Sequence, residues 1–182
     1  MTSTPSPAKT KGKKIYYVSI AAIILIFILF EYLLFLKGFY AFSADESGHT
    51  LEAYYWFKGG GNFFSIWLPF QKIVYTLALH IYYNLLLTPR ILSVLFGMMT
   101  LVSLIDLSFQ LFEYRNVSMI TGFLGVLFLP ITIFSVLPLA EIYFFFFTVI
   151  SIIITINKIK ANSQASYLVV VPIAEKNTES NK

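Results

Sequence analysis

The stretch IYYVSIAAIILIFILFEYLLFL, residues 15–36, decides the fold class of this 182-residue chain. Its 22 residues include one charged side chain, Glu31. A helix of that length rises about 33 Å, enough to cross the roughly 30 Å hydrocarbon core of a bilayer. A cleaved signal peptide with a site at residues 41–43 is the alternative, but signal peptides have apolar regions of only about 7–15 residues. We therefore predict a membrane-spanning helix.

The composition agrees with this prediction. Hydrophobic residues make up 58% of the chain and charged residues 12%, whereas soluble domains have about 45–50% and about 25%. A soluble enzyme is excluded. The lack of cysteine also excludes disulfides, thiolate metal sites and cysteine nucleophiles. The sequence has no P-loop, Rossmann, HExxH or GxSxG motif and no basic-aromatic surface, so we expect the lipid bilayer as a partner and no nucleic acid.

Three further apolar runs, at 91–112, 119–137 and 139–156, each approach the roughly 20 residues that a crossing needs. The segment 70–87 is also long enough, but its polar residues fall in one helical arc and its apolar residues in the opposite one, a pattern typical of an interfacial helix. The sequence thus predicts an all-α integral membrane protein with about four transmembrane helices and amphipathic helices on the outer surface.

The distribution of lysine and arginine predicts the orientation. Four spans place nine of these residues inside and four outside, whereas a crossing by 70–87 places five inside and eight outside. The positive-inside rule favours four spans, with both termini cytoplasmic, in the plasma or inner membrane. The predicted parts are a basic cytoplasmic tail (1–14), a membrane domain (15–157) that includes an outer loop (37–90), and a polar cytoplasmic tail (158–182).

The outer loop carries the candidate chemistry. Ser43 and Glu46 have the spacing of a capping box, and glycines 59–61 would end the same short helix. Under one interpretation, Glu46 and Asp45 merely stabilise that helix. Under the other, Asp45, Glu46 and His49 gather on the outer face with Glu141, which begins the last predicted span. Carboxylates there could act as general bases or bind a hard divalent cation as a cofactor.

Two carboxylates lie inside predicted spans, Glu31 near the outer end of the first and Asp106 near the inner end of the second. Intramembrane carboxylates often have a function. Because each lies within about two turns of an interface, we expect local pairing or access to water instead.

Short motifs in a fixed order resemble the N-terminal part of the GT-C glycosyltransferases, in particular protein O-mannosyltransferases, lipid A aminoarabinose transferases and RgtA/B/C/D-like enzymes. The resemblance covers about residues 15–156. The motifs are Ala44-Asp45-Glu46, Trp67-Leu68-Pro69, Pro89-Arg90-Ile91-Leu92-Ser93 with Gly97, and Leu137-Pro138-Leu139-Ala140-Glu141.

The resemblance implies a polyprenyl-phosphate-linked sugar donor and transfer with inversion at the anomeric carbon. It implies that the acidic pair Asp45 and Glu46 contains the catalytic base, and that Glu141 is the second acidic catalytic residue. We assign substrate binding to His49, Lys72 and Arg90. Lys72 and Arg90 could neutralise a lipid phosphate, or could simply anchor the chain at the interface.

Members of this family have many more spans than this chain. We therefore expect a truncated product, a small relative, or one half of a split enzyme, in which a second chain supplies the missing spans. The alternative function is a non-catalytic four-span membrane protein that acts as an assembly partner or is a remnant of such an enzyme.

Overall fold

The computed structural model describes residues 7–38, 44–60 and 69–179, and their side chains over 14–38, 45–60 and 69–162. All secondary structure in these ranges is helical, as the sequence predicted. The helices are α1 (Pro7–Leu36), α2 (Ala44–Phe57), α3 (Pro69–Ile81), α4 (Leu87–Phe112), α5 (Arg115–Leu127), α6 (Leu129–Val136) and α7 (Ala140–Glu179).

Three of the described helices are long and apolar enough to cross a membrane: Lys14–Leu36 of α1, Leu87–Phe112, which is α4, and Ala140–Asn162 of α7. This confirms a helical membrane protein. The predicted span at 119–137 is not one straight helix, because α5 and α6 meet at an angle of 54°. If this bent pair is a single span, the total is four.

Pro130 explains the bend between α5 and α6. Proline has no backbone N–H, so the carbonyl of Val126, four residues earlier, loses its helical donor. The hydroxyl of Thr132 donates to that carbonyl instead, at 3.0 Å. The Val126 carbonyl at the break thus keeps a hydrogen-bond donor from within the chain, as a lipid environment requires.

The helix α4 begins four residues before the predicted start at residue 91. The side-chain oxygen of Asn84 accepts hydrogen bonds from the backbone N–H groups of Leu86 and Leu87, at 3.0 and 2.9 Å. These bonds satisfy donors that an early helix start would otherwise leave without partners.

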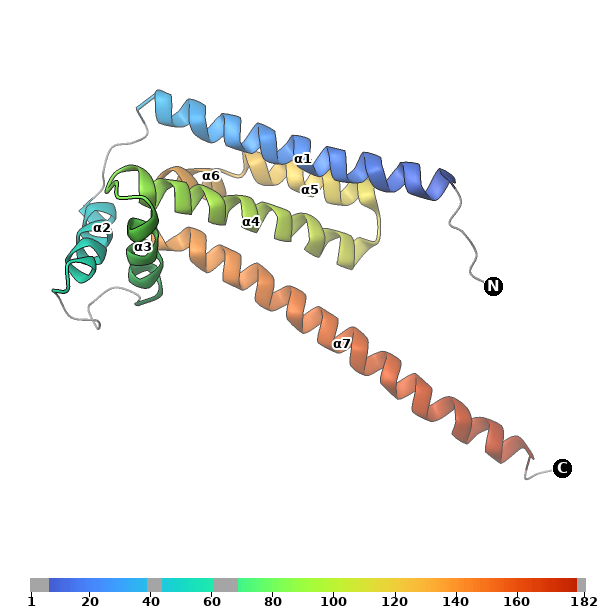
Figure 1. The fold of residues 1–182 in the computed structure, drawn as a ribbon. Helices are drawn as coiled ribbons and strands as arrows, with labels where there is room; N and C mark the ends of the chain where they lie inside the picture. The colour runs from blue at the N-terminus through green and yellow to red at the C-terminus, as the bar shows by residue number, and fades with distance from the viewer. Residues whose placement is uncertain (1–6, 39–43, 61–68, 180–182) are drawn as a thin grey trace.

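Figure 1 shows α2 and α3 gathered at one end of the bundle, where α1 ends and α4 and α7 begin. We call this the loop end. The start of α1 and the far part of α7 lie toward the opposite end. Between the ends, the buried core includes Phe27, Leu101, Ile105, Val126 and Ile142. It holds α1, α4, α5 and α7 together by apolar packing.

The helix α3 is too short to cross a bilayer, because its 13 residues rise about 20 Å. It is amphipathic, as expected of an interfacial helix, but its polar side faces the protein. Lys72 and Thr76 are buried, whereas Leu77 and Ile81 are 61% and 89% exposed. The Thr76 hydroxyl donates to the Ala53 carbonyl of α2 at 3.1 Å.

Candidate functional site

The helix α2 brings the predicted acidic residues to the loop end. It begins at Ala44, directly after the predicted cap Ser43, which lies outside the described residues. It ends as predicted at the glycine run. Gly59 has a φ of 78°, and the N–H of Gly60 bonds the carbonyl of Tyr55 at 2.9 Å. This Schellman-type end uses the left-handed conformation that glycine adopts without strain.

Glu46 forms a buried ion pair with Arg90 of α4. The Nη2 group of Arg90 donates to Oε1 of Glu46 at 2.5 Å, and the exposed fractions of the two residues are 4% and 0%. A second guanidinium nitrogen, Nη1, donates to the carbonyl of Leu86 at 2.6 Å. Burial of two charges is tolerated only with such compensation. The pair therefore ties the first turn of α2 to the first turn of α4.

His49 lies in α2 between Asp45 and Glu52. It is 6% exposed, and burial lowers the pKa of its imidazole below 6.5, while Asp45, Glu52 and Glu141 act in the opposite direction. Because the net shift of the His49 pKa is downward, the imidazole is neutral at pH 7. Three carboxylates from two helices, α2 and α7, thus act on one imidazole. Asp45 and Glu141 themselves are exposed.

Within the described residues, no group of three or more histidine, aspartate and glutamate side chains is arranged to hold a metal ion. The carboxylates that act on the pKa of His49 are therefore not arranged as a metal site in this part of the chain.

Lys72 is also paired. Its ammonium lies 3.1 Å from the carboxylate of Glu52, and Lys72 is buried whereas Glu52 is partly exposed. Both cations that we assigned to substrate binding, Lys72 and Arg90, thus contact carboxylates of α2. Sequence reasoning missed Glu52. Its spacing could have identified it, because Asp45, His49 and Glu52 follow the i, i+4, i+7 pattern of one helix face.

A polar network fixes α3 against the start of α7. The hydroxyl of Tyr75 donates to the carbonyl of Pro138 at 3.0 Å. The amide of Gln71 donates to the same carbonyl at 3.2 Å and contacts the Tyr75 oxygen at 3.0 Å. Burial raises the pKa of Tyr75, so its phenol stays protonated as a donor. The network therefore fixes the start of α7, which has Glu141 in its first turn.

Aromatic side chains surround a lysine beside this cluster. The ammonium of Lys58 lies 5.9, 5.6 and 5.7 Å from the ring centroids of Tyr54, Phe57 and Tyr83. These distances fit cation–π contacts. Trp67 and Leu68 of the second resemblance motif lie outside the described residues.

The arrangement offers two exposed carboxylates, Asp45 and Glu141, beside a neutral imidazole on a frame held by two ion pairs. Such carboxylates can accept a proton from a hydroxyl or orient it. Comparison of the chain with protein-family models, curated proteins and solved structures gave no match.

Proposed function

We propose that the chain is a membrane glycosyltransferase of the GT-C type, or the N-terminal part of one. It would transfer a sugar from a polyprenyl-phosphate-linked donor to an acceptor hydroxyl on the outer membrane face. One observation carries the proposal. The helix α3 links the two acidic segments, because its Thr76 hydroxyl donates to the Ala53 carbonyl of α2 and its Tyr75 hydroxyl donates to the Pro138 carbonyl just before α7. These contacts, with the influence of both Asp45 and Glu141 on the pKa of His49, support one site shared by the two acidic segments of the resemblance.

In the proposed reaction, the carboxylate of Asp45 removes the proton of the acceptor hydroxyl. The acceptor oxygen attacks the anomeric carbon, and the bond from that carbon to the phosphate oxygen breaks. The polyprenyl phosphate leaves with the electron pair. Glu141 orients the acceptor, and the Glu46–Arg90 pair holds α2 in position.

Departure of the phosphate is easier when a cation meets its developing charge. Lys72 is suited to this role, because its partner Glu52 lies at the margin of the site and is partly exposed. Phosphate binding would then exchange the contact between Lys72 and Glu52 for one between Lys72 and the phosphate.

The proposal includes a topology. The bent pair α5–α6 would form the third of four spans, and α3 would stay on the outer surface. The loop end would face outward, and both termini would be cytoplasmic, in the plasma or inner membrane. The charge distribution supports this choice.

The decisive experiment replaces Asp45 with asparagine and measures sugar transfer from polyprenyl-phosphate donors in reconstituted vesicles. Loss of the general base should reduce the rate about 10²–10⁴-fold. Glu113→Gln is the matched control, because Glu113 is exposed and follows the C-terminus of α4, whereas α2 lies at the loop end, where α4 begins. Unchanged transfer by Asp45→Asn at normal stability would rule out Asp45 as the base.

A non-catalytic assembly partner, or a remnant of such an enzyme, is the second candidate. The two ion pairs of α2 favour it, because they give Glu46, Glu52, Lys72 and Arg90 structural contacts. Under this function, the unmutated and correctly folded chain would transfer no sugar from any donor, and Asp45→Asn would leave complex formation unchanged.

A further inference from the structure

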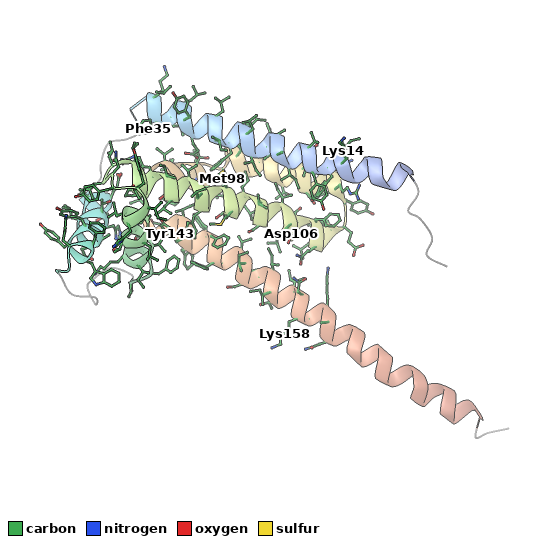
Figure 2. All side chains as sticks on the ribbon, in the orientation of Figure 1. Lys14, Phe35, Met98, Asp106, Tyr143 and Lys158 are labelled. Carbon is green, nitrogen blue, oxygen red and sulfur yellow. The ribbon has the colours of Figure 1, made fainter. Side chains whose placement is uncertain are left out.

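A groove runs along the outside of α1 and α4. Four residues of α1 line it (Ile28, Glu31, Tyr32 and Phe35), together with a stripe of α4 from Leu87 to Met98, and Val136 of α6 closes it. The α1 residues follow the i, i+3, i+4, i+7 spacing of a single helix face. The groove encloses about 390 Å³. Figure 2 labels Phe35 and Met98, which line it near the loop end and near the middle of the bundle.

Glu31 is the exceptional residue of the groove. It is 4% exposed, and neither of its carboxyl oxygens has a hydrogen-bond partner in the described part of the chain. It lies five residues before the end of α1, or about 8 Å inside the span. We expected local pairing or access to water, and no local hydrogen-bond partner is seen for Glu31 in this part of the chain. Such a partner is seen for Asp106, whose Oδ2 accepts a hydrogen bond from Gln110 at 2.7 Å.

A buried carboxyl without a partner is costly in an apolar environment. The remaining lining is almost wholly apolar apart from Arg90, which already donates to Glu46 and Leu86. The groove thus presents an apolar surface suited to a membrane segment and one acidic group suited to a cation. An acyl chain would match the apolar surface, but it would bring no donor to Glu31.

We propose that this groove receives a membrane-spanning helix of a different chain, and that a lysine or arginine of that helix pairs with Glu31. A groove between two helices fits the side-chain ridge of a third. Room is available, because only 17% of the residues in the most apolar part of α1 are buried. Because both carboxyl oxygens of Glu31 are covered, the basic side chain would contact them only after the side chains that cover them turn aside. This inference does not depend on the proposed transferase activity.

A second copy of this chain is a poorer occupant on grounds of charge. In a symmetric dimer with its axis along the membrane normal, Glu31 of each copy lies at the same depth. Two carboxyls would then face each other, and among the described groove residues the only cation that the second copy would bring is Arg90, which already pairs with Glu46. A helix with a basic residue at this depth supplies the complementary charge.

The test uses the full chain in phosphatidylcholine vesicles with synthetic leucine-alanine helices as probes. One probe carries a lysine at the depth of Glu31, and a matched probe carries leucine there. Binding is measured by energy transfer to a dye on Leu95→Cys, in the groove. Ile26→Cys is the control, because Ile26 is similarly exposed but lies on the opposite face of α1.

The lysine probe should bind about 3- to 30-fold more tightly than the leucine probe, the range of polar contacts between membrane helices. Glu31→Leu, and the closer mimic Glu31→Gln, should remove this preference. Glu31→Lys should transfer it to a probe with glutamate. Equal binding of both probes, or equal energy transfer at Leu95 and Ile26, would overturn the proposal in favour of lipid in the groove. Self-association through the Leu95 face would overturn it in favour of a second copy.

Discussion

At the scale of single residues, the buried pair Glu46–Arg90 gives the clearest stability prediction. Arg90→Met leaves the Glu46 carboxylate buried without its cation, so we expect the free energy of unfolding in detergent to fall by about 3–5 kcal/mol. The double variant with Glu46→Gln should recover part of this loss. Arg115→Met is the control, because Arg115 is exposed and stacks on the Tyr16 ring at 5.6 Å, a contact worth about 0.5–1 kcal/mol. Equal losses at both arginines would contradict the structural role of the pair.

His49 gives a prediction about pH. Its pKa in the folded chain lies below the ordinary 6.5, so the unfolded chain binds more protons as the pH falls through this value. The contribution of neutral His49 to the free energy of unfolding is complete above pH 6.5 and is lost as the pH falls below this value. We expect the free energy of unfolding to decline between about pH 7 and 5, and His49→Gln to reduce this decline. Parallel declines in both proteins would show that His49 is not responsible.

Helix spacing and topology predict from the sequence that Asp45, His49 and Glu141 lie at one end of the molecule. The contacts of Arg90 and Lys72 could not be predicted, because an ion pair across 44 residues of sequence, such as Glu46–Arg90, depends on how two helices cross. The sequence does not distinguish a lysine or arginine that binds a phosphate from one that forms an ion pair within the chain.

At the scale of helices, the break between α5 and α6 makes Thr132 important. Thr132→Val leaves the carbonyl of Val126 without its donor, which should lower the free energy of unfolding by about 1–3 kcal/mol. Thr155→Val is the control. The Thr155 hydroxyl donates to the carbonyl of Ser151 at 2.8 Å, but that carbonyl has a helical donor as well, and the change should be within about 0.5 kcal/mol. Similar losses from both variants would show that the break does not depend on Thr132.

Gly97 gives a second prediction at this scale. A Cβ atom there would meet Ser135 of α6 and would lie 3.0 Å from the Phe27 ring of α1. Gly97→Ala should therefore force these helices apart, with a loss of about 1–3 kcal/mol in the free energy of unfolding. Gly60→Ala, where the nearest atom is an ordinary 3.6 Å away, should change it by less than about 0.5 kcal/mol. A neutral Gly97→Ala would mean that α4 does not approach α1 and α6 so closely.

Periodicity predicted the amphipathic pattern of α3 but not the direction of its polar face. Apolar residues opposite a polar arc fit a helix that rests on a membrane. They fit equally well a helix that turns its polar arc toward α2 and the start of α7. The Tyr75–Pro138 contact decides between the two, and no local pattern reports it.

At the scale of the whole molecule, the proposed topology can be tested with two tyrosines. Tyr55 and Tyr114 are 58% and 72% exposed, and the chain has no native cysteine. A membrane-impermeant maleimide should label Tyr55→Cys in intact cells and Tyr114→Cys only after permeabilisation. Labelling of both in intact cells would mean that the segment 70–87 crosses the membrane. Glu141 would then lie across the bilayer from Asp45, and the shared site would be lost.

The outward-facing Leu77 and Ile81 of α3 also affect how reactants reach the loop end. If this end faces the outer leaflet, these side chains immerse one edge of the molecule among acyl chains. A water-soluble reactant would approach Asp45 and Glu141 from the aqueous phase, whereas a lipid-anchored reactant would reach them by lateral diffusion in the leaflet. The encounter rate of the lipid-anchored reactant would follow its mole fraction among the lipids. This rate would drop on surface dilution with inert lipid, even at constant bulk concentration.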